Sequence, residues 1–341
     1  MLSFQNDYSE GAHPAILDAL IRTNLVQQIG YGEDEYCVSA RKKIAEACGA
    51  PDAQVVFISG GTQVNAIAID NLLRPYEGAL CAVTGHINGH EAGAIEFTGH
   101  KCLALPHTEG KVSAADVKKY CQSFYADGTY PHMVHPGMLY ISHPTEYGTL
   151  YTLDELKALR AVCDEYHLPI YMDGARLGYG LMSPSTDVTL KDIAALMDAF
   201  TIGGTKVGAL CGEALVFPKG NMPRGFITIT KQRGAMMAKG RLMGVQFDTL
   251  FTDDLYLRCG EAGIRQAMRL KSALLEKGYT LHMDSPTNQQ FVLLDDAQLA
   301  RLEGKVLFSV WERPDDTHTV IRLATSWATT DEMTDSLIAL L

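Results

Sequence analysis

Short apolar runs that alternate with helical segments are the feature of this sequence that most constrains its fold. Seven such runs lie before residue 220: Val55–Ile58, Ala79–Val83, Cys102–Leu105, Met138–Ser142, Ile170–Asp173, Phe200–Ile202 and Ala214–Phe217. Runs that are apolar almost throughout are typical of strands buried on both faces of a sheet. Thr152–Tyr166 shows the clearest helical period between them, with a capping box of Thr152 and Glu155 at its start. The sequence therefore predicts an α/β fold with a mainly parallel seven-stranded sheet covered by helices.

The pattern changes after about residue 245, where a second and smaller domain is expected. A long helical stretch is followed by three strand patterns and a last helix: Asp253–Lys277, then Gln290–Leu294, Val306–Trp311 and Val320–Ala324, then Asp331–Leu341. A chain of 341 residues is also longer than one compact core usually requires. We therefore predict a large domain over residues 1–245 and a small C-terminal α+β domain over residues 246–341, with an N-terminal segment that can pack on the small domain.

Composition narrows the possible partners and the location of the protein. The net charge of -11 disfavours nucleic acid and anionic membranes as partners, because phosphate surfaces would repel the protein. The eight cysteines include no CxxC pair, and several lie in apolar runs, which is typical of free thiols in a reducing compartment. The sequence shows neither a secretory signal nor a stretch of about 20 apolar residues. We therefore expect a cytoplasmic protein that acts on a small molecule.

Asp173 and Lys206 follow neighbouring predicted strands. Asp173 ends the run Ile170–Asp173, and Lys206 follows the run Phe200–Ile202 in a segment that carries no other charge. Because parallel strands end at the same edge of a sheet, both side chains are expected at one site. Pyridoxal phosphate needs such a pair, namely a carboxylate that faces the pyridine nitrogen and an amine that forms a Schiff base with the aldehyde. The alternative is a capped strand end and a surface lysine, which the glycine-rich surroundings of Lys206 disfavour.

A candidate phosphate site lies where the run Val55–Ile58 meets the helical segment Gln63–Leu73. Gly60, Gly61 and Thr62 stand between the two. Glycines let the backbone approach an anion closely, and a helix N-terminus offers unpaired amides and the positive end of the helix dipole. The same Gly-Gly-Thr can serve as an ordinary turn, so this assignment depends on the neighbouring motifs.

His86, His90 and Glu91 follow the run Ala79–Val83 and are expected at the same edge of the sheet. An imidazole at this point could stack on a pyridine ring and exchange protons with a substrate. A metal site is disfavoured, because no cysteine or further ligand lies nearby in the sequence. On these residues alone, a polar loop with helix-capping side chains is an equal alternative.

Taken together, these motifs resemble the threonine aldolase and aromatic β-eliminating lyase family of fold-type I pyridoxal-phosphate enzymes. The resemblance extends over nearly the whole chain, and its motifs occur in family order: Asn6–Asp7, Tyr31–Asp34, Gly60–Thr62, His86 with Glu91–Gly93, Asp173–Arg176, Gly204–Lys206 and Ile321–Trp327. The substrate-side segment, Asn6-Asp7-Tyr8 here, departs from the Ser-Asp-Thr of the family. The resemblance implies a homo-oligomer, a dimer of dimers, whose subunits share active sites.

The resemblance implies a role at the cofactor for each matching residue. Lys206 would be the Schiff-base lysine, Asp173 the partner of the pyridine nitrogen, and His86 the residue stacked on the ring. The phosphate would be held by backbone and hydroxyl groups of one segment and by a cation from a basic cluster across the subunit interface. The two sets are Gly60, Gly61 and Thr62, and Lys231, Lys239 and Arg241.

The resemblance also implies a substrate site between the domains. Arg176 and Arg322 would bind the substrate α-carboxylate, for which a planar guanidinium is well suited. Arg176 would border the cofactor as well. Asp7 would lie at the substrate, and Tyr31 would reach into the site of a neighbouring subunit.

The activity that the resemblance implies is retro-aldol cleavage of L-threonine, L-allo-threonine or a related β-hydroxy-α-amino acid to glycine and an aldehyde. His86, His90 or Glu91 would remove the β-hydroxyl proton. β-Elimination or transamination with the same cofactor is the main alternative, because one electron sink serves all three reactions. A nucleotide-binding dehydrogenase or a non-catalytic binding domain is a more distant alternative, since no Gly-x-Gly-x-x-Gly follows the first strand.

Overall fold

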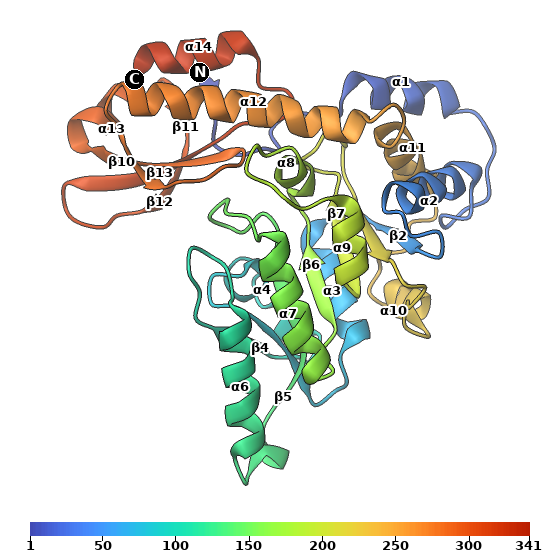
Figure 1. Ribbon diagram of the computed structural model, residues 1–341. Helices are drawn as coiled ribbons and strands as arrows, with labels where there is room; N and C mark the ends of the chain where they lie inside the picture. The colour runs from blue at the N-terminus through green and yellow to red at the C-terminus, as the bar shows by residue number, and fades with distance from the viewer.

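Seven strands form the central sheet of the protein, whose computed structural model describes residues 1–341 (Figure 1). They are β2 (Gln54–Ile58), β3 (Glu77–Ala82), β4 (Cys102–Leu105), β5 (His135–Ser142), β6 (Ile170–Asp173), β7 (Ala199–Gly203) and β8 (Glu213–Phe217). Their order across the sheet is β2-β8-β7-β6-β5-β3-β4. The five strands β7, β6, β5, β3 and β4 run parallel, and β8 is antiparallel to both β7 and β2. The prediction of a mainly parallel seven-stranded α/β sheet is therefore confirmed.

Helices connect these strands and cover the sheet. Up to residue 250 they are α1 (Pro14–Thr23), α2 (Glu35–Ala47), α3 (Gly61–Leu72), α4 (His86–Gly89), α5 (Ala94–Phe97), α6 (Ala114–Ala126), α7 (Leu153–Glu165), α8 (Leu177–Leu181), α9 (Leu190–Leu196), α10 (Phe226–Gln232) and α11 (Arg241–Leu250), with a 3-10 turn at Tyr130–His132. Thr152 and Glu155 form the predicted capping box at the start of α7. None of the chain's helices has the length and apolar character needed to cross a membrane.

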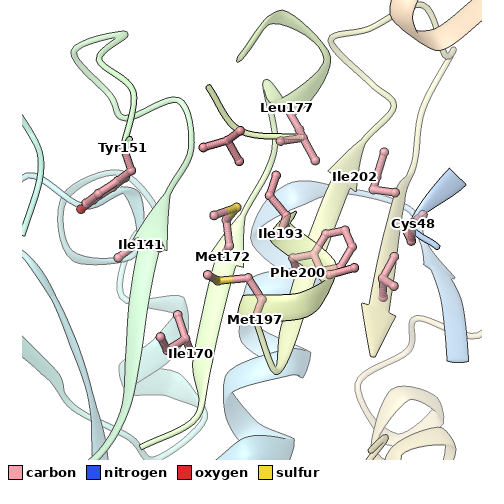
Figure 2. Packing of buried hydrophobic residues seen from close by; sticks show 14 of the residues in the cluster. Cys48, Ile141, Tyr151, Ile170, Met172, Leu177, Ile193, Met197, Phe200 and Ile202 are labelled. Atoms are coloured by element: carbon pink, nitrogen blue, oxygen red, sulfur yellow. The ribbon is translucent and has the colours of Figure 1, made fainter. Parts of the chain in front are cut away.

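Side chains alternate along each strand between two cores on opposite faces of the sheet. In β6, Ile170 and Met172 belong to the larger buried cluster, and Tyr171 belongs to the smaller one. The larger cluster packs against α1, α2, α6, α7, α9 and α11, and Figure 2 shows Met172, Phe200 and Ile202 within it. The smaller cluster packs against α3, α4, α5 and α10. The predicted runs are apolar at almost every position because helices cover both faces of their strands.

A four-stranded antiparallel sheet follows in the last quarter of the chain. Its order is β12-β13-β10-β9, formed by β9 (Thr280–Met283), β10 (Gln289–Asp295), β12 (Ser309–Glu312) and β13 (His318–Ala324). Three helices accompany it: α12 (Leu255–Glu276), α13 (Asp296–Leu302) and α14 (Asp331–Leu340). The sequence predicted β10, β13, α12 and α14 but not β9 or α13. β9 has no buried residue, so it lacks the apolar run by which the other strands were recognised.

The prediction of one strand over Val306–Trp311 is wrong. β11 (Val306–Leu307) pairs in parallel with the N-terminal strand β1 (Leu2–Ser3), whereas β12 begins at Ser309 and pairs with β13. The pairing continues beyond β1, because the N–H of Phe4 donates to the carbonyl of Leu307 at 2.8 Å. Pairing with the N-terminal strand β1 therefore places the first part of the predicted strand in a different sheet from the second part.

α12 joins two of the three hydrophobic cores. Its first half, with Cys259 and Ile264, belongs to the larger cluster, and its second half, with Leu270 and Leu274, belongs to a third cluster on the four-stranded sheet. Figure 1 shows α12 as a long helix that runs from the side of α11 across to this small sheet. α11, which spans residue 245, packs on α1 and α2. We propose the division into residues 1–245 and 246–341, with α12 as the element that both parts share.

Gly260 determines how closely α12 approaches α8. A Cβ atom at Gly260 would lie 2.2 Å from the carbonyl oxygen of Gly178, a backbone atom that cannot rotate away. Gly260→Ala should therefore lower the free energy of unfolding by about 1–3 kcal/mol, although alanine favours a helix over glycine by about 1 kcal/mol. Urea denaturation measures the change. Gly11→Ala is the control, because a Cβ there meets no atom within 4 Å. A Gly260→Ala protein as stable as the wild type would contradict this packing.

Candidate active site

The segments at and after the ends of β2, β3, β5, β6 and β7 line one cavity at the carboxyl edge of the sheet. Six of the sequence-predicted site residues line it: Gly61, His86, Glu91, Asp173, Arg176 and Lys206. The side chains of Asp173 and Lys206 thus share one cavity, although 33 positions separate them in the sequence. Parallel strands bring about this meeting, because the ends of β6 and β7 lie next to each other.

The carboxylate of Asp173 accepts three hydrogen bonds from neighbouring groups. The backbone N–H of Ala175 donates to Oδ1 at 2.9 Å. The hydroxyl of Tyr140 and the Nδ2 amide of Asn65 donate to Oδ2 at 2.8 Å and 2.9 Å. Asp173 itself is buried. These donors fix the orientation of the carboxylate toward the cavity.

Asn65, in the first turns of α3, connects two buried acids. Its Nδ2 amide donates both to Asp173 and to Oε1 of Glu91, the latter at 2.7 Å. The hydroxyl of Tyr171 donates to its Oδ1 at 2.7 Å, so every polar atom of the side chain has a partner. One amide group therefore provides a hydrogen bond to each of two buried acids.

Glu91 in turn orients His86. Nδ1 of His86 lies 2.7 Å from Oε1 of Glu91, and the Glu91 side chain is fully buried. Burial alone would lower the pKa of His86, but the hydrogen bond to Glu91 and the negative charges of Asp173 and Glu91 outweigh it. The net effect raises the pKa of His86 and favours an imidazolium whose Nε2 side is free of Glu91.

The amine of Lys206 is in the opposite situation. Burial and the nearby charge of Arg176 lower its pKa, although Asp7, Asp173 and Glu213 act in the other direction. A lowered pKa increases the share of neutral, nucleophilic amine. Two contacts fix the backbone around it: the hydroxyl of Tyr179 donates to the carbonyl of Lys206 at 2.6 Å, and Oε2 of Glu213 accepts from the N–H of Gly204 at 3.1 Å.

The N-terminus of α3 is open toward an anion. Gly60 is the N-cap residue, and no side chain caps the first amides of the helix. A Cβ atom at Gly60 or Gly61 would meet no other atom within 4 Å, so space remains above these amides. Thr62 is exposed beside them. Free amides at the positive end of a twelve-residue helix fit a phosphate group.

Arg176 is held by Asp7 in a two-pronged ion pair. Nε and Nη2 of Arg176 donate to the two carboxylate oxygens of Asp7 at 2.7 Å and 2.9 Å, and Asn288 donates to Asp7 at 2.9 Å. Asp7 is buried and does not line this cavity or the outer cavity that adjoins it. Its contact is with the arginine, whose remaining Nη1 group is outside the pair.

A second, outer cavity adjoins the first one and shares four lining residues with it. Arg322 from β13 and Arg176 from the segment after β6 both line it, together with Tyr8, His90 and Trp311. Nη1 of Arg322 donates to Gln289 at 3.1 Å, and its guanidinium lies 6.0 Å from the centre of the Trp311 ring. The small sheet and the large sheet therefore each bring one guanidinium to the same space.

Seven of the predicted residues line neither cavity of this chain. Gly60 and Thr62 flank Gly61, which lines the inner one, and Asp7 binds Arg176. The other four lie apart from the site: Tyr31, Lys231, Lys239 and Arg241. Tyr31 and Lys231 contact each other, with Nζ 4.6 Å from the ring centre. The Arg241 guanidinium donates to the backbone carbonyls of Thr23 and Val26. Lys239 is exposed. Within one chain, none of the four contacts the site.

Sequence reasoning missed Asn65, Tyr140, Ser142 and Glu146. Ser142 ends β5 and Glu146 follows it, at the same edge as Asp173, so the rule that found Asp173 could also have found them. Tyr140 lies within the apolar run of β5, and Asn65 lies within α3. At neither position does the residue type by itself indicate a functional site. Their roles become visible only from their partners.

Comparison with known proteins places the chain among lyases. Residues 6–297 match the family model described as beta-eliminating lyase. The chain is 30% identical over 311 residues to a low-specificity L-threonine aldolase of Pseudomonas sp., a match that covers 89% of this chain and 87% of that protein. A solved structure described as threonine aldolase of Leishmania major has a TM-score of 0.96 at 42% identity and covers 100% of this chain and 98% of that one. An aspartate aminotransferase of Thermus thermophilus, at 14% identity and a TM-score of 0.71, shares the fold, which is fold-type I.

The Asp7–Arg176 pair gives a testable dependence of stability on pH. Burial alone would raise the pKa of Asp7, but the charges of Arg176 and Lys206 and the hydrogen bonds from Arg176 and Asn288 lower it from 3.8 to about 2. Because the folded pKa is the lower one, this stabilisation is present above pH 3.8 and is lost as the pH falls toward 2.

Asp7→Asn should therefore lower the free energy of unfolding by about 3–5 kcal/mol at neutral pH, because it leaves the buried cation of Arg176 unpaired. The difference from the wild type should shrink as the pH falls toward 2. Urea denaturation over this range measures it, with exposed Asp52→Asn as the control. A difference that stays constant with pH would contradict the assignment.

Proposed function

The chain belongs to the beta-eliminating lyase family, and on that premise we propose that it is a pyridoxal-phosphate enzyme that cleaves L-threonine, L-allo-threonine and related β-hydroxy-α-amino acids to glycine and an aldehyde. The observation that carries the proposal is the cavity that Lys206, Asp173 and the open N-terminus of α3 share. The similar proteins named threonine aldolases support the same reaction.

The residues of the cavity fit this cofactor. Lys206 would hold it covalently, Asp173 would face the pyridine nitrogen, and His86 would lie on the ring face. Gly60, Gly61 and Thr62 would hold the phosphate. When bound there, pyridoxal phosphate supplies a sink for the electron pair released as the Cα–Cβ bond of the substrate breaks.

The surroundings of each of these protein groups suit its role. Three donors hold the carboxylate of Asp173 in a fixed orientation, in which it can face a pyridine nitrogen. The lowered pKa of Lys206 favours the neutral amine that can bond to the cofactor. Glu91 holds His86 in one orientation, so the imidazole can keep a ring in place without rotating.

The substrate carboxylate would bind between Arg176 and Arg322. The two guanidinium groups come from the two sheets of the protein and line the same outer cavity. Asp7 occupies Nε and Nη2 of Arg176 and thereby fixes the plane of that guanidinium. A carboxylate bound by both arginines would orient the rest of the substrate toward the inner cavity.

The three predicted bases differ in their access to a substrate. His90 is exposed and lines only the outer cavity. Glu91 is fully buried, and both His86 and Asn65 occupy its Oε1. His86 lines both cavities, but its raised pKa favours the imidazolium, which donates a proton rather than accepts one.

β-Elimination and transamination are the alternative reactions at the same site, because they need the same electron sink. Their products differ from those of the aldolase reaction, which makes the choice an experimental one. A nucleotide-binding dehydrogenase has no support in the family match.

We also propose a homo-oligomer with shared active sites, a dimer of dimers, in a cytoplasmic and reducing environment. The eight cysteines are free thiols. Large apolar side chains on α1, α2 and the segment between them are exposed: Ile21, Leu25, Ile29, Tyr31 and Val38. A second copy that covered this surface would also approach Lys231 and Arg241, which contact Tyr31 and Val26.

Lys206 provides the direct test of the proposed function. The wild type with bound pyridoxal phosphate should convert L-threonine or L-allo-threonine to equal amounts of glycine and acetaldehyde. Lys206→Ala should abolish both the cleavage and the visible absorption of the bound cofactor, and borohydride treatment of the wild type should leave the cofactor on the peptide that contains Lys206. Exposed Lys119→Ala is the control. A keto acid in place of glycine would favour elimination or transamination, and a Lys206→Ala protein that keeps the absorption would refute the site.

Arg322 tests the carboxylate site. Arg322→Lys keeps the charge but loses the two-pronged geometry, so it should raise KM for L-threonine by about 10–100-fold, which corresponds to one charge-assisted hydrogen bond of 1.5–3 kcal/mol. Steady-state kinetics measure this change. The visible absorption of the cofactor should stay the same, because Arg322 does not line the inner cavity. Exposed Arg301→Lys is the matched control. An unchanged KM would exclude Arg322 from the carboxylate site.

A further inference from the structure

Glu146 is an acid at the centre of the site to which neither the sequence motifs nor the proposed function assigns a role. It lies in the turn after β5, where its Oε1 accepts from the backbone N–H of His86 at 2.9 Å and from the hydroxyl of Ser142 at 2.6 Å. Both bonds end on the same oxygen. They fix the carboxylate and leave Oε2 available to a ligand.

The position of Glu146 relative to the two cavities is unusual. Only four residues line both the inner and the outer cavity, namely His86, Glu146, Arg176 and Lys206. A substrate whose amine reaches the inner cavity and whose carboxylate reaches Arg176 and Arg322 must lie along the wall that these four residues form. The side chain of the substrate, including a β-hydroxyl, is then within the space that they border.

Of these four residues, Glu146 alone is suited to accept a proton from the substrate. Arg176 is permanently charged and bound to Asp7, and Lys206 is assigned to the cofactor. His86 is bound to Glu91 through Nδ1, and its raised pKa favours the imidazolium, which has no free acceptor nitrogen. Burial also raises the pKa of Glu146, although the hydrogen bond from Ser142 opposes the shift. A carboxylate with a raised pKa is a stronger base than an exposed one, and Oε2 of Glu146 carries no hydrogen bond from the protein.

We propose that Glu146 is the catalytic base that removes the β-hydroxyl proton of the substrate, an inference that rests on the proposed function. The proton moves from the hydroxyl to Oε2 of Glu146, and the electron pair of the O–H bond becomes the second C–O bond of the aldehyde. The Cα–Cβ bond breaks, and its electron pair stays with the Cα fragment. One proton is then added at Cα to give glycine, so the proton that Glu146 took up is balanced and no co-reactant is required.

Glu146→Gln is the variant that tests this role with the least disturbance. The amide oxygen of glutamine can accept the same two hydrogen bonds from His86 and Ser142, and its NH2 group takes the place of Oε2. Loss of the base should lower kcat/KM for L-threonine by about 10²–10⁴-fold. The unfolding midpoint, the visible absorption of the cofactor and the binding of glycine, measured by titration of that absorption, should match the wild type.

Two further measurements distinguish a base from a structural residue. Exchange of the glycine Cα hydrogen in D2O, followed by NMR, needs the cofactor and the carboxylate site but no β-hydroxyl, so Glu146→Gln should retain it. In the wild type, kcat/KM should rise with pH as Glu146 loses its proton, at a pH above 4.5. This rise, the acidic limb of the pH profile, should be absent in Glu146→Gln. Glu146→Asp should restore part of the activity together with the limb. Glu165→Gln, which changes an acid at the surface end of α7, is the matched control.

The outcomes separate this inference from the proposed function. A wild-type enzyme that cleaves L-threonine while Glu146→Gln cleaves it equally fast would overturn the role of Glu146 alone. Equal losses of cleavage and glycine exchange, with an unchanged pH profile, would also overturn it by showing a structural role. A wild type that neither cleaves L-threonine nor exchanges glycine would overturn the proposed function and this inference with it.

Discussion

The common direction of β3, β5, β6 and β7 is the constraint on which the site depends. Because the four strands are parallel, the residues after them meet at one edge of the sheet. His86, Glu146, Asp173 and Lys206 each follow or end a different one of these strands. Reversing any one strand would carry its side chain to the opposite edge. The helices on both faces keep the strands parallel, since such a sheet is stable only when both faces are covered.

Closely spaced charges at this edge are tolerated because each has a partner. Burying an unpaired carboxylate is costly, and Asp173 and Glu91 also repel each other. Asn65 resolves both problems by donating to each of them from one amide group. Tyr140 and Tyr171 complete the network as donors, and burial raises their pKa values well above the usual range, so they stay protonated. These hydrogen bonds orient the side chains of the site, which favours catalysis by positioned groups.

The two sheets contribute different functions to the site. The large sheet supplies the groups proposed to hold the cofactor and to move protons, and the small sheet supplies Arg322. α12 fixes the two relative to each other, with a glycine where it crosses α8. In the proposed mechanism, His86 and Glu146 divide the proton chemistry between a donor and an acceptor. Their connection is direct, because the N–H of His86 binds the carboxylate of Glu146.

The sequence by itself determined the central sheet and its likeness to a family, because a buried strand and a glycine-rich turn leave their pattern in consecutive residues. It also brought Asp173 and Lys206 together, since strand direction follows from the alternation of strands and helices. Only the tertiary structure decided which groups complete the site. Asn65 acquires its role from Glu91 and Asp173, Asp7 from Arg176, and the strand near residue 306 is divided by the N-terminus. Hydrogen bonds and ion pairs between separate segments of the chain leave no local pattern, because either partner alone reads as an ordinary polar residue.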